Sequence, residues 1–203
     1  MADNVVVYLV DDDEEVRRAL AFLLGTAGLA VRVYDSANAL LEKLDTTHFG
    51  CIVSDVRMPG TDGIQLLREL KSRGVTLPVI VMTGHADVAL AVGAMKAGAV
   101  DFIEKPFSDD VLLDAISAAM ANLGNAAENA SQVSLVRSRI ATLSDREKEV
   151  LEGLLAGNPN KTIAYDLAIS PRTVEVHRAS VMRKMSAASL SQLVRMALLA
   201  QTS

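Results

Sequence analysis

The sequence has few of the residues that build disulfide or zinc scaffolds. It contains one cysteine, three histidines and no tryptophan in 203 residues. A single cysteine cannot form an internal disulfide, which is typical of proteins in a reducing cytoplasm. Cys51 lies in an apolar, strand-like run, so we interpret it as a small core residue. His48, His85 and His177 have no partner cluster of metal-ligating residues, which argues against a zinc site.

Long apolar runs are also absent. No run approaches the roughly 18 residues that a helix needs to cross a bilayer, and the first four residues carry no basic segment typical of a secretion signal. We therefore expect a soluble, cytoplasmic protein that does not engage membranes. Half of the residues are apolar, and the acidic and basic residues are well mixed, which favours a globular chain over a disordered one.

The net charge of −5 is unevenly distributed. Residues 1–123 carry 18 acidic against 10 basic residues, whereas residues 141–203 carry 6 acidic against 8 basic. An acidic first part is expected if it gathers carboxylates around a cation. A mildly basic second part permits nucleic-acid binding but does not demand it.

The first 120 residues alternate strand-like and helix-like segments. Strands are predicted at 5–10, 30–34, 50–54, 78–82 and 100–104, and amphipathic helices near 14–26, 36–44, 63–73, 86–97 and 108–121. Strict alternation predicts the α/β class, a doubly wound (βα)5 parallel sheet with helices on both faces. The weak run at 30–34 suggests an edge strand. We take residues 1–121 as one domain.

The remainder differs in architecture. Residues 122–140 are interpreted as a linker, partly helical because Val133, Val136 and Ile140 recur at helical spacing. Strand signals stop in residues 141–203, where four helices are predicted to form an all-α domain.

Two helix starts in this second domain have clear sequence signals. Ser144 and Glu147 have the spacing of a capping box, and Ser170 followed by Pro171 supplies an N-cap and a proline at the first helical position.

Polar side chains follow four of the predicted strands. Asp11 and Asp12 follow the first strand, Asp55 the third, Thr83 the fourth and Lys105 the fifth. The carboxyl ends of parallel strands converge on one crevice. Three acids, one hydroxyl and one ammonium in one crevice describe a Mg²⁺-dependent site that accepts a phosphoryl group.

Each group has a role in such a site. Mg²⁺ prefers oxygen ligands and keeps several waters. Asp12 and Asp55 can supply carboxylate oxygens, Asp11 can orient a metal-bound water, and the backbone carbonyl of Arg57 can supply another ligand. Phosphoryl transfer also needs neutralisation of negative charge, which the Lys105 ammonium can provide, and the Thr83 hydroxyl can donate to a phosphoryl oxygen.

Four motifs resemble the receiver domains of two-component response regulators. They are Val-Asp-Asp-Asp at 10–13, Ser-Asp-Val-Arg-Met-Pro-Gly-Thr-Asp-Gly at 54–63, Met-Thr-Gly at 82–84 and Glu-Lys-Pro-Phe at 104–107. The resemblance covers residues 5 to about 121. It implies that Asp55 is the phosphoacceptor, that a sensor histidine kinase donates the phosphoryl group, and that Thr83 and Phe102 form a switch pair. We expect the phosphorylated chain to form a homodimer through the 86–121 face and to be released from inhibition.

The second domain resembles the helix-turn-helix domains of the LuxR/NarL group. The residues that carry this resemblance are Leu-Ser-Asp-Arg-Glu-Lys-Glu-Val-Leu at 143–151, Asn-Lys-Thr-Ile-Ala at 160–164 and Ser-Pro-Arg-Thr-Val-Glu-Val-His at 170–177. It implies a recognition helix that enters the major groove of promoter DNA. Phosphate contacts are expected from Lys161, Arg172, Thr173 and His177, base-edge contacts from Glu175, Val176 and Ala179, and Arg178 is a further exposed position of that helix.

Longer runs at 83–85, 94–107 and 163–179 make the whole chain similar to the nitrogen-fixation response regulators. That resemblance implies an oxygen-sensing kinase, RNA polymerase as a partner in transcription activation, and target genes for microaerobic life.

Two other interpretations stay open. A haloacid-dehalogenase-like phosphatase also uses an aspartyl nucleophile, but it needs Asp-x-Asp followed by Thr or Val, and here Glu14 follows Asp13. The second alternative is an interaction module whose receiver domain is never phosphorylated.

Overall fold

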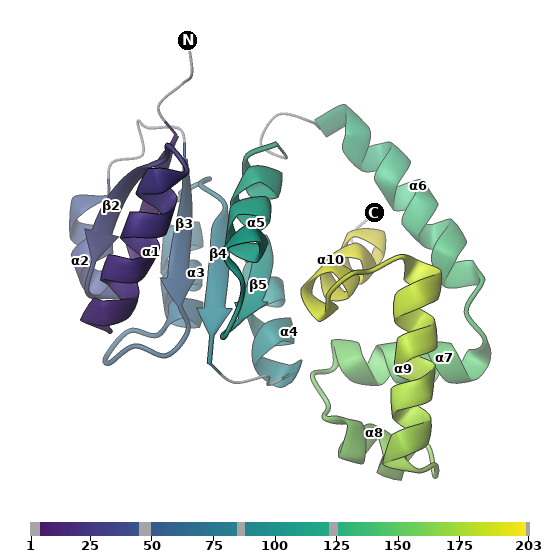
Figure 1. Ribbon diagram of the computed structural model, residues 1–203. Helices are drawn as coiled ribbons and strands as arrows, with labels where there is room; N and C mark the ends of the chain where they lie inside the picture. The colour runs from purple at the N-terminus through teal and green to yellow at the C-terminus, as the bar shows by residue number, and fades with distance from the viewer. Residues whose placement is uncertain (1–4, 45–49, 85–87, 122–125, 202–203) are drawn as a thin grey trace. The chain divides into compact units, whose positions relative to one another are not determined.

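The computed structural model describes residues 5–44, 50–84, 88–121 and 126–201. The chain divides into two compact units, residues 1–85 with 97–124 and residues 86–96 with 125–203 (Figure 1). Within the described ranges, every helix is too short or too polar to traverse a lipid bilayer.

The first unit is built on one sheet of five parallel strands. They are β1 (Val6–Val10), β2 (Ala30–Tyr34), β3 (Gly50–Asp55), β4 (Val79–Thr83) and β5 (Asp101–Glu104), in the order β2-β1-β3-β4-β5. The predicted doubly wound sheet is confirmed, and the weak run at 30–34 is an edge strand, as the sequence suggested.

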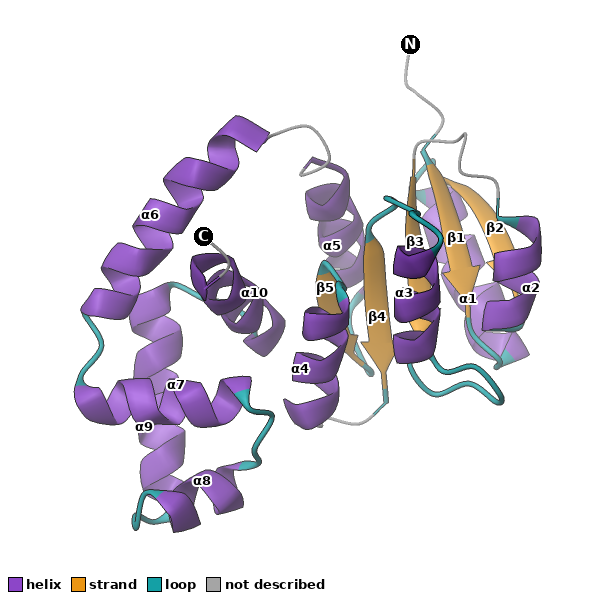
Figure 2. Cartoon of the chain, turned by 180° about the vertical axis from the view of Figure 1, so that it is seen from behind, coloured by secondary structure: helices purple, strands orange, loops and turns teal. Residues whose placement is uncertain are grey.

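Helices cover both faces of this sheet. α1 (Glu14–Thr26) and α5 (Asp109–Ala121) lie on one face, and α2 (Ala37–Lys43) and α3 (Gly63–Ser72) lie on the other (Figures 1 and 2). Between β4 and β5 the chain forms α4 (Val88–Ala97). Every residue of β1, β3 and β4 is buried. A strand covered on both faces must be apolar on both, which explains the continuous runs of Val and Ile in the sequence.

The core on the α1 and α5 face joins strands to helices. Leu9, Val53 and Met82 from the strands pack in one cluster with Leu24 of α1 and Leu112 of α5. This packing fixes the carboxyl ends of the central strands, where the predicted functional residues lie.

Besides residues 86–96, the second unit contains the helices α6 (Ala126–Ala141), α7 (Asp145–Leu155), α8 (Asn160–Asp166), α9 (Pro171–Met185) and α10 (Leu190–Gln201). The four helices predicted after residue 141 are therefore present. Ser144 forms a capping box with Glu147, and Ser170 caps α9 with Pro171 at its start, as the sequence predicted.

The linker is more helical than the sequence analysis expected. α6 begins at Ala126, seven residues before Val133, the first of the residues whose spacing predicted a helix in the linker. The reason is composition, because alanine has the highest intrinsic helix propensity and recurs through 126–130. Residues 122–125 of the predicted linker lie outside the described residues.

Candidate functional site

Strand register brings the predicted acidic and basic residues together. The pairing of β1 with β3 places Asp11 beside Asp55, and the pairing of β4 with β5 places Lys105 just beyond Thr83. Because β1, β3, β4 and β5 are neighbours in the sheet, Asp11, Asp55, Thr83 and Lys105 all lie at the carboxyl-terminal ends of its strands. The convergence predicted from strand ends is therefore a result of sheet register.

The Lys105 ammonium lies between the two buried carboxylates. Its Nζ donates to Oδ2 of Asp11 at 2.7 Å and to Oδ1 of Asp55 at 2.6 Å. Asp11 and Asp55 are both buried, whereas the Lys105 side chain is 23% exposed. Two acids share one cation, so this cluster carries a formal charge of −1 and attracts a further cation.

These contacts also raise the pKa of Lys105. Burial alone would lower the pKa of the ammonium, but the hydrogen bonds to Asp11 and Asp55 and the charges of the two carboxylates outweigh that effect. Lys105 therefore stays charged at neutral pH.

Backbone groups orient the same two carboxylates. Oδ1 of Asp11 accepts from the backbone N–H of Asp13 at 3.0 Å, and Oδ2 of Asp55 accepts from the backbone N–H of Arg57 at 2.6 Å. The Arg17 guanidinium donates to the backbone carbonyl of Asp11 at 2.7 Å. Each carboxylate thus presents one oxygen to a backbone donor and the other to Lys105, which fixes its direction before any ligand arrives.

Gly63 was not among the predicted site residues, yet the local geometry requires it. A Cβ on Gly63 would lie 2.4 Å from the backbone oxygen of Asp55 and 3.0 Å from Cα of Val56. Only a residue without a side chain lets the start of α3 approach the end of β3 this closely. Its sequence signal is its position directly after Asp62, the N-cap of α3.

The residues fit a magnesium ion held by few side chains. Within the described residues, no three or more Asp, Glu, His or Cys side chains are grouped closely enough to hold a metal, and Asp12 is exposed. Mg²⁺ commonly binds through one or two carboxylates and keeps waters as its other ligands. The buried, oriented carboxylates of Asp11 and Asp55 are oxygen donors of this kind, and Asp12 and the Arg57 carbonyl adjoin them in the chain.

The predicted switch residues lie on neighbouring strands. Thr83 ends β4 and is fully buried, and Phe102 of β5 is paired with Val81 and is partly buried. Their concerted movement stays a prediction. His85 and the first two residues of the predicted 86–121 face lie outside the described residues, as does His48.

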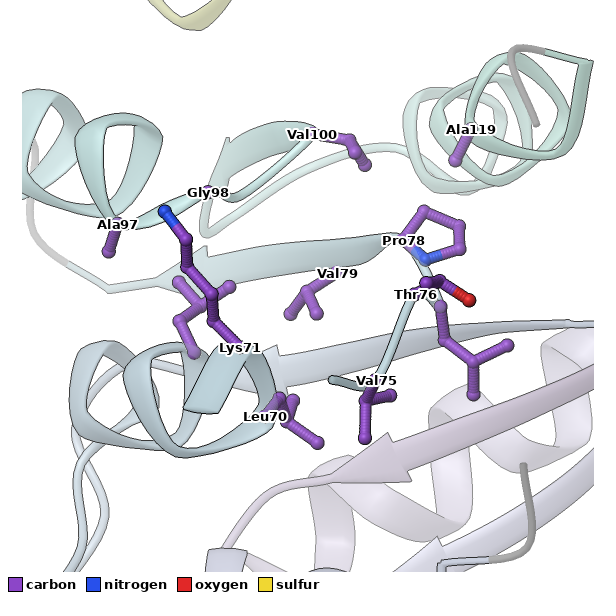
Figure 3. Close-up of a pocket in the computed structure, with 12 residues that line it drawn as sticks. Leu70, Lys71, Val75, Thr76, Pro78, Val79, Ala97, Gly98, Val100 and Ala119 are labelled. Atoms are coloured by element: carbon purple, nitrogen blue, oxygen red, sulfur yellow. The ribbon is translucent and has the colours of Figure 1, made fainter. Parts of the chain in front are cut away.

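A separate cavity lies at the opposite end of β4, where Val79 begins the strand (Figure 3). Its volume is about 320 Å³, and Figure 3 shows apolar side chains, including Leu70 and Val75, around it. Lys71 is the charged residue of its lining, and the lining contains no carboxylate. The chemistry of the Asp11–Asp55–Lys105 cluster therefore has no counterpart in this cavity.

In the second unit, α9 presents an exposed polar face. Arg172, Glu175, Val176 and Ala179 are exposed and line one open depression on the surface of this helix. Val176 is 64% exposed. The structure thus gathers all three predicted base-edge residues with one predicted phosphate contact.

The other predicted DNA-contacting residues differ in how exposed they are. Lys161 is exposed on α8, Thr173 is partly buried and lies 2.8 Å from the Ser170 hydroxyl, and His177 and Arg178 are partly buried. Sequence reasoning missed Tyr165 of α8, which is 87% exposed. No local pattern distinguishes it, because a tyrosine can face either the core or the solvent.

The C-terminal half of α9 is held by a buried carboxylate. Glu147 of α7 accepts from the Ser180 hydroxyl at 2.7 Å and from the Lys184 ammonium at 2.6 Å. Together with the backbone N–H of Ser144, these donors hold the pKa of Glu147 at about 2, below its ordinary 4.5, with the Lys184 hydrogen bond as the largest cause. The sequence analysis identified Glu147 only as a capping residue.

Comparisons with known proteins agree with this division of the chain. Residues 7–117 match the family model of the response regulator receiver domain, and residues 141–197 match that of the bacterial regulatory proteins of the luxR family.

Two curated relatives are similar over nearly the whole chain. The transcriptional regulatory protein FixJ of Azorhizobium caulinodans is 58% identical, over 98% of this chain and 95% of that protein. FixJ of Rhizobium meliloti is 54% identical, over 96% of both. Among solved structures, full-length FixJ from B. japonicum is 50% identical and covers both chains completely, with a TM-score of 0.58.

Proposed function

Because the chain belongs to the response regulators that join a receiver domain to a luxR-family DNA-binding domain, we propose that phosphorylation of Asp55 controls promoter binding by α9. The donor is a phosphohistidine on a sensor histidine kinase. In the transfer, the nitrogen–phosphorus bond of the donor breaks, a bond forms between a carboxylate oxygen of Asp55 and phosphorus, and the histidine nitrogen retains the electron pair.

The observation that carries this proposal is the Lys105 ammonium held between Asp55 and Asp11. A carboxylate that attacks a phosphoryl group brings two negative groups together, so the site must supply positive charge. Lys105 supplies it at Asp55 Oδ1, and the Arg57 backbone N–H holds Asp55 Oδ2. A Mg²⁺ bound at Asp11, Asp12, Asp55 and the Arg57 carbonyl would supply further neutralisation of charge.

The consequence of phosphorylation is a shift between two states. A new dianionic group at Asp55 gives Lys105 and the Thr83 hydroxyl a phosphoryl oxygen to contact, and Phe102 then occupies the space that Thr83 leaves. Moving an equilibrium from 1:99 to 99:1 requires about 5.5 kcal/mol of differential stabilisation. Several charge-assisted hydrogen bonds to one phosphoryl group are of this order.

The phosphorylated state forms a homodimer through the 86–121 face, and dimerisation relieves inhibition of DNA binding. One helix-turn-helix contacts one half-site weakly, whereas two linked copies bind two half-sites with much higher affinity. The dimer then activates transcription with RNA polymerase. The likeness to two transcriptional regulatory proteins FixJ supports a role in transcription regulation. The resemblance of the sequence to the nitrogen-fixation response regulators further suggests an oxygen-sensing kinase and microaerobic or nitrogen-fixation target genes.

The test uses a small phosphodonor with Mg²⁺ and the full chain. Wild type should be labelled once per chain and should dimerise, and Asp55→Asn should abolish both changes. Asp35→Asn is the matched control, because Asp35 also follows a strand of the sheet but is exposed and accepts a hydrogen bond from its neighbour Ser36. Equal dimerisation and DNA binding with and without donor would favour the unphosphorylated interaction module. Sustained turnover of a generic phosphate ester would favour the phosphatase.

A further inference from the structure

The second half of α6 packs into the helical unit that carries α9. Val136 is 4% exposed, and Ile140 is partly buried. Figures 1 and 2 both show this half of α6 beside the end of α9 that leads toward α10. The region predicted as a linker therefore contributes a packed helix to this unit.

Two arginines of α6 bind carbonyls at the ends of two other helices. The Arg139 guanidinium donates to the carbonyl of Met185, the last residue of α9, at 2.9 Å. Arg137 donates to the carbonyl of Ala200, the penultimate residue of α10, at 3.2 Å and 3.4 Å. The last four carbonyls of a helix lack partners within it, and a cation there also interacts favourably with the helix dipole.

The same end of α9 is held by α7 and the turn before it. Lys184 donates to the Thr142 carbonyl at 3.2 Å and pairs with Glu147, and Ser180 donates to Glu147. The contacts of α6 and α7 thus gather on the C-terminal half of α9. Arg172, Glu175 and Val176 in its N-terminal half stay exposed. α8 packs against α9, and Val174 in the N-terminal half is buried, so the helix is held along its length and moves as one rigid body. A change of angle at its C-terminal end therefore also displaces the exposed residues of its N-terminal half.

We propose that Arg139 is a positioning residue for DNA recognition, which sets the angle of α9 through the Met185 carbonyl without touching DNA. This inference rests on the proposed contact of α9 with base edges. It makes α6 a part of the DNA-reading unit, so the boundary of that unit lies before residue 139 rather than at 141. Loss of the contact lets α9 sample several angles. Phosphate contacts tolerate this variation, because long side chains such as Lys161 and Arg172 can follow the DNA backbone, whereas recognition of base edges is the property most sensitive to angle.

The experiment compares Arg139→Gln with Arg137→Gln in the full chain, both treated with phosphodonor and Mg²⁺. The two residues lie on the same helix and make the same kind of bond, but only Arg139 binds α9. The probes are a duplex selected from random-sequence DNA by wild type and a shuffled duplex of equal length. Affinities are measured at a temperature where the circular dichroism of each variant equals that of wild type.

Arg139→Gln should lower affinity for the selected duplex about three- to tenfold, as expected for one charged hydrogen bond at a helix end, with little change on the shuffled duplex. Arg137→Gln should preserve the ratio of the two affinities. The slope of affinity against salt should stay unchanged in both variants, because the number of phosphate contacts is unchanged. Arg139→Lys retains a cationic donor and should recover part of the ratio.

Equal losses on both duplexes, or a similar loss of ratio in Arg137→Gln, would show that Arg139 only stabilises the fold and would overturn the inference. An Arg139→Gln variant that discriminates as wild type does would also overturn it. If wild type itself selects no duplex, the proposed DNA contact of α9 fails first, and that result is distinct from a failure confined to the variant.

Discussion

The carboxylate of Glu147 and the ammonium of Lys184, 37 residues apart in the chain, lie 2.6 Å from each other and join α7 to α9. Because Glu147 is buried, an amide in its place leaves one acceptor oxygen for the three donors of Ser144, Ser180 and Lys184, and it removes the charge that pairs with Lys184. Glu147→Gln should therefore destabilise the helical unit by about 2–3 kcal/mol. Hydrogen exchange of the α9 amides measures this loss. Glu152→Gln, at an exposed position of α7, should leave exchange unchanged.

The stability of the same unit should depend on acid pH. The pKa of Glu147 is about 2 in the folded chain and 4.5 ordinarily, so its stabilising contribution is fully present above pH 4.5 and is lost as the pH falls toward 2. The melting temperature of wild type, measured at several pH values between 4.5 and 2, should show the loss of this stabilising contribution. A Glu147→Gln variant that keeps the same pH dependence would contradict this assignment.

Lys105→Ala should make the first unit depend on magnesium. Without the ammonium, Asp11 and Asp55 repel each other, and we expect a loss of about 2 kcal/mol, less than for a fully buried pair because Lys105 is partly exposed. Added Mg²⁺ should restore most of this loss, so Mg²⁺ should raise the melting temperature of the variant more than that of wild type. Lys71→Ala, which removes an exposed lysine without an acidic partner in the described residues, should respond to Mg²⁺ as wild type does.

The raised pKa of Lys105 gives a second, alkaline test. Its stabilising contribution is present below the ordinary pKa of 10.5 and is lost as the pH rises through the higher pKa of the folded chain. Urea denaturation between pH 8 and the alkaline limit of the fold should show this loss in wild type and not in Lys105→Ala.

Gly63→Ala should damage both stability and phosphorylation. Its Cβ would lie 2.4 Å from the Asp55 backbone oxygen, so the end of β3 or the start of α3 must shift, at a cost of about 1–3 kcal/mol. Labelling by the phosphodonor should slow because Asp55 moves with that backbone. The control is Gly25→Ala in α1, where a Cβ meets no atom within 4 Å and where alanine should stabilise the helix. Normal labelling of Gly63→Ala would show that the site tolerates the shift.

Ala168→Gly should stabilise the helical unit. Ala168 lies in the turn between α8 and α9 with φ of 53°, a left-handed conformation that costs an L-residue with a Cβ roughly 1 kcal/mol. Glycine adopts it freely, so the melting temperature of this unit should rise. Ala156→Gly, at a right-handed position after α7, should instead lower it. A fall in both variants would mean that the conformation of Ala168 carries no strain.

Sequence patterns predicted the convergence of Asp11, Asp55 and Lys105 because a parallel sheet aligns its strand ends in a regular way. They also predicted the caps at Ser144 and Ser170, since capping depends on residues three positions apart. Arg139 and the wider role of Glu147 escaped prediction because their partners lie 46 and 33 to 37 residues away on helices whose packing angle no local pattern encodes. The exposure of Asp12 beside a buried Asp11 likewise depends on the path of the chain after β1.

The span of the Lys105 contacts also bears on when the site is assembled during folding. Its partners lie 94 and 50 residues earlier in the chain, and each of the three residues follows or ends a different strand. Contacts so distant in sequence form only when the sheet closes as a whole. A chain whose sheet is incomplete therefore holds Asp55 without the adjacent ammonium of Lys105. If Asp55 is the phosphoacceptor, as we propose, only molecules with a complete sheet can be phosphorylated at this site.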